Sequence, residues 1–234
     1  MTIDDENYAN EMAKRVLRVE ERIAAACTSA RRDRSSVQLL AVSKGHGPER
    51  IQAAVDAGLH VFGENKVQEA RAKIPLAPHN SQWHLIGHLQ TNKIKFAVQL
   101  FDTVHSVDSL KLLRALNQGA EAAGVNLSVL LEVNVSGEAS KYGLTPDAVP
   151  EVLEAAAQCF ALDVVGLMTI PPFTEDPEGA RPHFVRLRTL RDEWRESTGF
   201  PLEELSMGMS HDLEVAIEEG ATWVRVGTDL FGKR

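Results

Sequence analysis

The sequence predicts a single closed (β/α)8 barrel, or TIM barrel, with one extra helix at its N-terminus. Short apolar runs alternate with helical patterns eight times along the 234 residues, as expected for parallel strands joined by helices. No long linker or low-complexity segment divides the chain, so we expect one domain over residues 1–234. A length near about 250 residues is typical of this architecture.

The elements follow in a regular order. A helical pattern covers about residues 5–32, with Met12, Val16, Val19 and Ile23 at spacings of three and four. Strands are then expected at 37–44, 59–63, 81–87, 101–105, 127–135, 164–169, 204–209 and 223–227. Helices are expected between them, beginning near residues 48, 64, 94, 109, 146, 179 and 210. An open, doubly wound sheet is the alternative, but no dinucleotide-binding glycine fingerprint follows the first strand.

Composition excludes several classes of function. The net charge of −8 argues against non-specific binding to nucleic acid or to anionic membranes. Cys27 and Cys159 are isolated, which favours a reducing compartment. No stretch has the length and apolar character of a membrane span or a signal peptide. We therefore expect a cytoplasmic protein, and the self-contained barrel suggests a monomer.

Lys44 is the first candidate functional residue. It ends the apolar run that begins at Val37, and with period two it shares a face with Leu40 and Val42. Both faces of this run are apolar, as in a strand covered on both sides. A lysine at the carboxyl end of a barrel strand is placed for chemistry, because a free amine condenses with carbonyl compounds to give a Schiff base. The alternative is a salt-bridged or snorkelling lysine.

Two later segments predict an anion site at the same end of the barrel. Ser210 follows the seventh strand, and Gly227 and Thr228 follow the eighth. Loops after these two strands commonly hold a phosphate group in TIM barrels. The alternative is that Ser210 and Thr228 simply cap helices.

Polar residues inside the barrel are further candidates. In the eighth strand Val224 and Val226 share one face, so Arg225 points the other way, toward the barrel mouth and Lys44. Its alternative role is an ion pair with Glu132 in the fifth strand. Asn65 and His84 are placed to add polar contacts, although a histidine within a strand is more often a satisfied core residue.

Six segments resemble the pyridoxal phosphate homeostasis protein family, which is itself similar to the N-terminal barrel of alanine racemase. They cover nearly the whole chain in order: Leu40-Ala-Val-Ser-Lys44, Phe62-Gly-Glu-Asn-Lys-Val-Gln-Glu69, Trp83-His-Leu-Ile-Gly-His-Leu-Gln-Thr-Asn-Lys93, Gly166-Leu-Met-Thr169, and Leu205-Ser-Met-Gly-Met-Ser-His-Asp-Leu-Glu-Val-Ala-Ile217 with Val224-Arg-Val-Gly-Thr228.

The resemblance implies a cofactor and a set of residues that hold it. Pyridoxal 5′-phosphate (PLP) would be bound to Lys44 as an internal aldimine, with Arg225 facing the pyridine nitrogen. The remaining cofactor-binding residues would be Asn65 near the ring, Met168 packing on it, His84, and the phosphate-binding Ser210, Gly227 and Thr228. The chain departs from the usual family pattern at Gly45-His46-Gly47 and at His211. Two glycines within three residues predict a more flexible loop beside Lys44.

Three functions are compatible with these residues. The one the resemblance implies is a PLP-binding protein that stores, buffers or delivers the cofactor, with apo PLP-dependent enzymes as recipients and no turnover of its own. An amino-acid racemase is the second, but it needs an acid–base group on each face of the substrate, and neither Tyr8 nor Tyr142 sits in a motif that supplies the second. A Schiff-base aldolase is the third.

Overall fold

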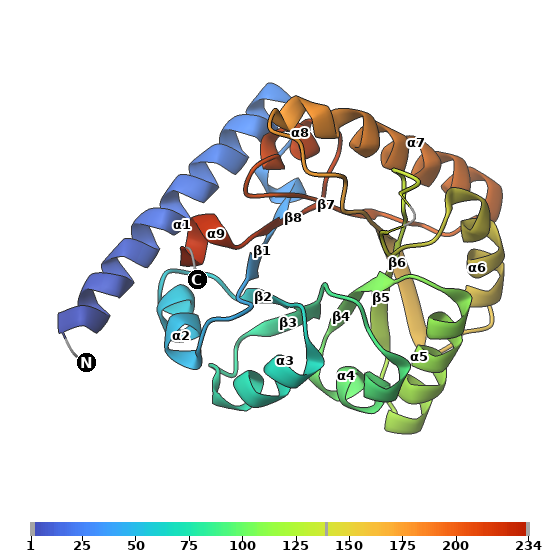
Figure 1. The fold of residues 1–234 in the computed structure, drawn as a ribbon, viewed down its shortest axis with the longest axis horizontal. Helices are drawn as coiled ribbons and strands as arrows, with labels where there is room; N and C mark the ends of the chain where they lie inside the picture. Colours follow the sequence, from blue (N-terminus) through green and yellow to red (C-terminus); the bar gives the residue numbers. More distant parts are fainter. Residues whose placement is uncertain (1–2, 139, 233–234) are drawn as a thin grey trace.

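The predicted barrel is confirmed in the computed structural model, which describes residues 3–138 and 140–232. Eight parallel strands pair in chain order, and β8 pairs with β1 to close the ring (Figure 1). The strands are β1 Gln38–Val42, β2 Val61–Glu64, β3 Gln82–Leu85, β4 Thr103–Val107, β5 Leu127–Glu132, β6 Leu162–Met168, β7 Glu204–Met209 and β8 Trp223–Val226.

Helices surround this ring. They are α1 Ile3–Ser29, α2 Pro48–Asp56, α3 Val67–Lys73, α4 Ile94–Leu100, α5 Leu110–Ala123, α6 Val149–Ala156, α7 Arg181–Thr198, α8 Leu213–Glu218 and α9 Thr228–Phe231. Short 3-10 helices lie at η1 Arg34–Ser36, η2 Ile74–Leu76, η3 Thr91–Lys93, η4 Pro146–Ala148 and η5 Pro177–Ala180.

Two of the predicted boundaries that differ from the structure bear on the site. β1 ends at Val42, so Lys44 lies in the turn after the strand rather than within it. Glu64 does not begin a helix, because it is the last residue of β2 and pairs with Leu85 of β3. The sequence predicted a helix from Glu64 because an acidic residue ahead of a helical pattern is typical of a first helical turn. The pairing of β2 with β3, which joins segments distant in sequence, places Glu64 in a strand instead.

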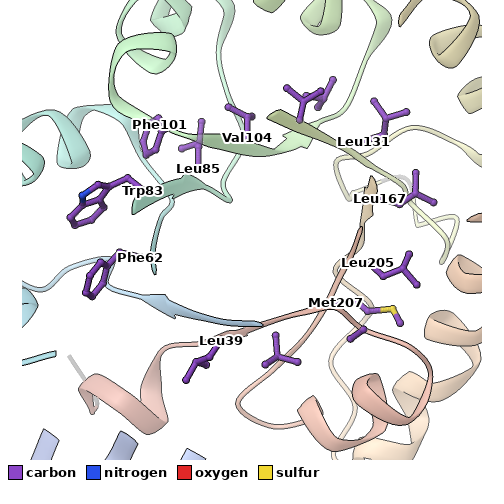
Figure 2. Packing of buried hydrophobic residues seen from close by; sticks show 14 of the residues in the cluster. Leu39, Phe62, Trp83, Leu85, Phe101, Val104, Leu131, Leu167, Leu205 and Met207 are labelled. Atoms are coloured by element: carbon purple, nitrogen blue, oxygen red, sulfur yellow. The ribbon is translucent and has the colours of Figure 1, made fainter. Parts of the chain in front are cut away.

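The strands bury both of their faces, as their apolar sequences predict. Leu39 and Ala41 of β1 belong to the layer between strands and helices, and Figure 2 shows members of this layer directed away from the barrel axis. Leu40 and Val42 alternate with them and pack inside the barrel against Ile86. Fully burying one such aliphatic side chain contributes roughly 1.5–3 kcal/mol. If the alternation continues beyond Val42, every second side chain after β1 points toward the barrel mouth.

The N-terminal helix α1 lies outside the ring and packs against α8, α9 and α2 (Figure 1). Met12, Val16, Val19 and Ile23 form its buried stripe, which confirms the predicted helical face. The helix therefore covers the elements that follow β7 and β8.

Candidate functional site

A cavity of about 250 Å³ lies at the carboxyl ends of β1, β2, β7 and β8. This is the end of a TIM barrel at which active sites form. The cavity brings together six of the eight predicted site residues: Lys44, Asn65, Ser210, Arg225, Gly227 and Thr228. His84 and Met168 are buried but are not among the described residues that line it.

Lys44 supplies an amine to this cavity. Its side chain is half-buried in the turn after β1 and lines the same wall as Val42. Val42 points into the barrel with Leu40, so the period-two pattern gave the direction of Lys44 correctly even though the strand ends two residues earlier.

Arg225 is the buried positive charge of the site. Val224 and Val226 pack toward the helices, and Arg225 points inward from between them, with an exposure of 4%. Its guanidinium donates to the Ser206 hydroxyl at 2.7 Å and to the Thr169 carbonyl at 2.9 Å. Burial lowers the pKa of Arg225 to about 10, so the group remains protonated at neutral pH.

The suggested ion pair between Arg225 and Glu132 does not form, because the guanidinium binds Ser206 and Thr169 instead. Glu132 is nonetheless buried nearby, with an exposure of 7%. Burial, with a further contribution from Asp108, raises the pKa of Glu132 to about 7 against the opposing charge of Arg225. An interior carboxyl group thus titrates near neutral pH beneath the site.

His84 belongs to a hydrogen-bonded chain inside the barrel. Its Nδ1 lies 2.9 Å from His105 Nε2, and His105 Nδ1 lies 2.9 Å from the Ser206 hydroxyl that also accepts from Arg225. Burial lowers the pKa of His84 to about 4, so its ring is neutral at physiological pH. His84 therefore contacts the site through two intermediaries, as a satisfied core histidine.

The two hydroxyl-bearing residues of the predicted anion site are not helix caps. Asp212 occupies the cap position of α8, and its carboxylate accepts from the Met209 N–H at 2.6 Å. Ser210 lies in the turn before it. Gly227 is the cap residue of α9, and Thr228 is the first residue of that helix. The capping alternative is therefore wrong at both Ser210 and Thr228.

Arg22 of α1 joins these two loops, and the sequence analysis did not identify it. Its guanidinium donates to the Ser210 carbonyl at 2.8 Å, to the Asp229 carboxylate at 2.6 Å, and to the Glu214 carboxylate at 2.6 and 2.9 Å. The loop after β7 and the start of α9 are thereby held to one side chain. The sequence feature that could have identified Arg22 is its position directly beside the apolar stripe of α1.

Asn65 is placed by an unusually close approach of two backbone segments. A side chain at Gly87 would come within 2.3 Å of the Asn65 carbonyl oxygen, so only glycine fits there. The Asn65 side-chain oxygen is buried without a hydrogen-bond partner. A buried polar atom of this kind, at the wall of a cavity, is suited to a ligand.

The cavity wall also contains residues that the sequence analysis did not select as ligands. His46 stacks on Phe231 of α9 with ring centroids 5.1 Å apart, and His211 lies 3.0 Å from the Thr174 carbonyl. The apolar part of the wall consists of Val42, Ile86, Ile170 and Met209. Their position next to predicted site residues was the only signal for them.

Comparison with known proteins places this barrel in a class. Residues 18–234 match the family described as alanine racemase, N-terminal domain. The pyridoxal phosphate homeostasis protein of Aquifex aeolicus is 46% identical over 222 residues, which cover 94% of this chain and 97% of that protein.

Two solved structures are similar over most of the chain. A protein from Bifidobacterium adolescentis described as unknown has a TM-score of 0.91 at 40% identity, covering 99% of this chain and 98% of its own. PipY of Synechococcus elongatus, solved with PLP bound, has a TM-score of 0.79 at 39% identity, covering 90% of this chain and 100% of its own. The chain therefore belongs to the pyridoxal phosphate homeostasis protein family, within the class of alanine racemase N-terminal barrels.

Over residues 3–138 and 140–232, no helix has both the length and the apolar surface needed to span a membrane. Within the same residues, no cluster of three or more histidine, cysteine, aspartate or glutamate side chains could hold a metal ion.

Proposed function

We propose that this protein binds PLP covalently through Lys44 and serves in intracellular PLP homeostasis. The observation that carries the proposal is that one cavity is lined by Lys44, which has an amine, by Arg225, which has a buried guanidinium, and by Ser210 and Thr228, which have hydroxyls. These groups complement the aldehyde, the ring nitrogen and the phosphate of PLP respectively. The PLP-bound PipY structure supports the same ligand.

Each cavity residue has a role in this proposal. Lys44 would attach to the aldehyde carbon, Ser210 with Gly227 and Thr228 would hold the phosphate, and Asn65 would contact the ring with its unpartnered oxygen or its amide nitrogen. A bound PLP supplies an electron-withdrawing ring conjugated to the lysine. Arg225 does not release its proton at neutral pH, so it would leave the ring nitrogen unprotonated and the ring a weaker electron sink.

The remaining two predicted residues fit a supporting role. His84 would act on the ligand only through His105, Ser206 and Arg225. Met168 precedes Thr169, whose carbonyl accepts from Arg225. We therefore assign both to the layer beneath the cofactor.

The site supports binding better than turnover. A two-base racemase needs a second acid–base group opposite the lysine, and tyrosine was the group considered for this role. Tyr8 lies beneath the guanidinium of Arg50, 3.4 Å from ring centroid to carbon, and Tyr142 stacks on His88 at 4.1 Å. Neither lines the cavity. We therefore propose a carrier that passes PLP to apo enzymes, as a cytoplasmic monomer.

The test is reduction with borohydride followed by peptide mapping of protein purified with PLP. We expect the label on Lys44 and its loss in Lys44→Ala, with circular dichroism unchanged. Comparable label on Lys66, Lys93 or Lys141 would refute the attachment site.

Turnover of alanine at about 1 s⁻¹ or faster, within the ordinary range of enzymes, would refute the carrier. Mixing the holo protein with an apo PLP enzyme tests delivery, since that enzyme should gain activity.

A further inference from the structure

The residues on both sides of Lys44 are bound to the β2–α3 segment. The Ser43 carbonyl accepts a hydrogen bond from the Lys73 ammonium at 2.8 Å, and the Ser43 hydroxyl donates to Glu64 Oε1 at 2.6 Å. On the other side, the Gly45 N–H donates to the Glu69 carboxylate. Lys44 is thus held between two anchored neighbours.

Lys73 is the centre of this arrangement. It is 4% exposed, although a lysine is rarely so deeply buried. Its ammonium contacts the Ser43 carbonyl, the Glu64 carboxylate and the Glu69 carboxylate, the last at 3.0 Å. These three acceptors match its three N–H donors. The second carboxylate oxygen of Glu64 is buried without a hydrogen-bond partner, but all three donors of Lys73 are used, and one of them holds the backbone carbonyl of Ser43.

The two carboxylates differ in their environment. Burial raises the pKa of Glu64 against the hydrogen bonds from Lys73 and Ser43. Burial also acts to raise the pKa of Glu69, but hydrogen bonds from Gly45 and Lys73 outweigh it and place the pKa below its ordinary value. Glu69 is therefore a charged acceptor at neutral pH, and it is the member of the group nearest to solvent.

The anchors oppose the freedom that the local sequence gives to this turn. Gly45 has a φ of +79°, a conformation that suits glycine, and Gly47 follows two residues later. Such a loop is predicted to be flexible. The bond from Gly45 to Glu69 removes that freedom at the residue next to Lys44.

We propose that Glu69 and Lys73 are positioning residues for Lys44, which fix the backbone on both sides of it so that its amine is presented into the cavity. This inference rests on the proposed function, in which Lys44 reacts with PLP. In that reaction the nitrogen of Lys44 forms a double bond to the aldehyde carbon, and the aldehyde oxygen leaves as water with the two amine protons. The rate of this step depends on the orientation of the amine.

The experiment compares Glu69→Ala with Glu69→Gln, because glutamine keeps an oxygen that can accept from Gly45. Glu20→Ala is the matched control, since Glu20 pairs with Arg34 at 2.6 Å at similar exposure on a wall remote from the cavity. Amide hydrogen exchange at Gly45 in the PLP-free protein reports the anchor. The rate of borohydride-trapped labelling of Lys44 by PLP reports the reactivity.

In Glu69→Ala we expect exchange at Gly45 to be about tenfold faster and labelling of Lys44 about tenfold slower, as for the loss of one hydrogen bond to a charged group. Glu69→Gln should recover part of both effects, and Glu20→Ala should change neither. Labelling at the wild-type rate in Glu69→Ala would overturn this inference and leave the proposed function intact. Absence of label on Lys44 in the wild-type protein would instead refute the proposed function.

Discussion

Arg225 donates a hydrogen bond to the Ser206 hydroxyl over 2.7 Å, and Ser206 continues a hydrogen-bonded chain across the barrel to His105 and His84. Arginine has donors only, so Ser206 accepts from it and can donate onward to His105 Nδ1. His105 then carries its proton on Nε2 and donates to His84 Nδ1. With Ser206 as the donor to His105, both interior histidines carry their proton on Nε2.

The first prediction is that Ser206→Ala destabilises the protein more than another buried serine does. The substitution removes the hydrogen-bond partner of Arg225 Nη1 and of His105 Nδ1, at a cost of about 1–3 kcal/mol per buried group. Ser106→Ala is the control, because Ser106 is equally buried and donates only to the Gly87 carbonyl. Urea unfolding of both variants measures the difference. Equal losses would contradict the role of the chain.

The second prediction separates phosphate recognition from attachment. Thr228→Ala should weaken retention of PLP about tenfold, the loss expected for one charge-assisted hydrogen bond. Binding of pyridoxal, which has no phosphate, should stay nearly unchanged and serves as the internal control. Equilibrium dialysis with each compound measures both affinities. If the unmodified protein bound the two equally well, no phosphate would be recognised there.

These predictions rest on features that the sequence revealed to different degrees. Period-two alternation predicted the inward direction of Arg225, and the apolar run predicted the strand that leads to Lys44. Both signals are local, so they can be seen in a single segment. The partners of Arg225 are Thr169, which directly follows β6, and Ser206 of β7, and the next member of the chain is His105 of β4. Such contacts depend on the register between strands, which no one segment contains.

Arg22 was missed for a related reason. The pattern of α1 identifies the apolar face, but the acceptors of Arg22 lie about 190 to 207 residues further along, at Ser210, Glu214 and Asp229. A charge beside an apolar stripe is usually solvated. Only the folded barrel shows that this one is bound to the segments that follow β7 and β8.

The third prediction concerns that contact. Arg22→Ala should weaken PLP binding about tenfold or more, because hydrogen bonds to charged groups that hold both loops are lost. Dialysis against PLP measures the effect. Arg34→Ala is the matched control, since Arg34 has nearly the same exposure and an ion pair of the same length with Glu20. A similar loss of affinity in both variants would indicate a general effect on stability.

The last prediction uses the pKa of Glu132, which lies at about 7 in the folded protein and near its ordinary value when unfolded. Above neutral pH the native state must keep a buried carboxylate charged, which costs up to about 3 kcal/mol. The cost falls as pH falls from 7 and disappears below the unfolded pKa. Glu132→Gln should therefore stabilise the protein at about pH 8 and have little effect at about pH 4.5.

His84 acts in the opposite direction over an overlapping range, since its pKa of about 4 makes the native state lose stability as pH falls below the unfolded value. Wild type and Glu132→Gln must therefore be compared at each pH, so that the contribution of His84 cancels in the difference. Urea unfolding across this pH range measures the difference in the free energy of unfolding between the two proteins, with Glu138→Gln as an exposed control. A difference that is the same at both ends of the range would show that Glu132 does not titrate near neutral pH.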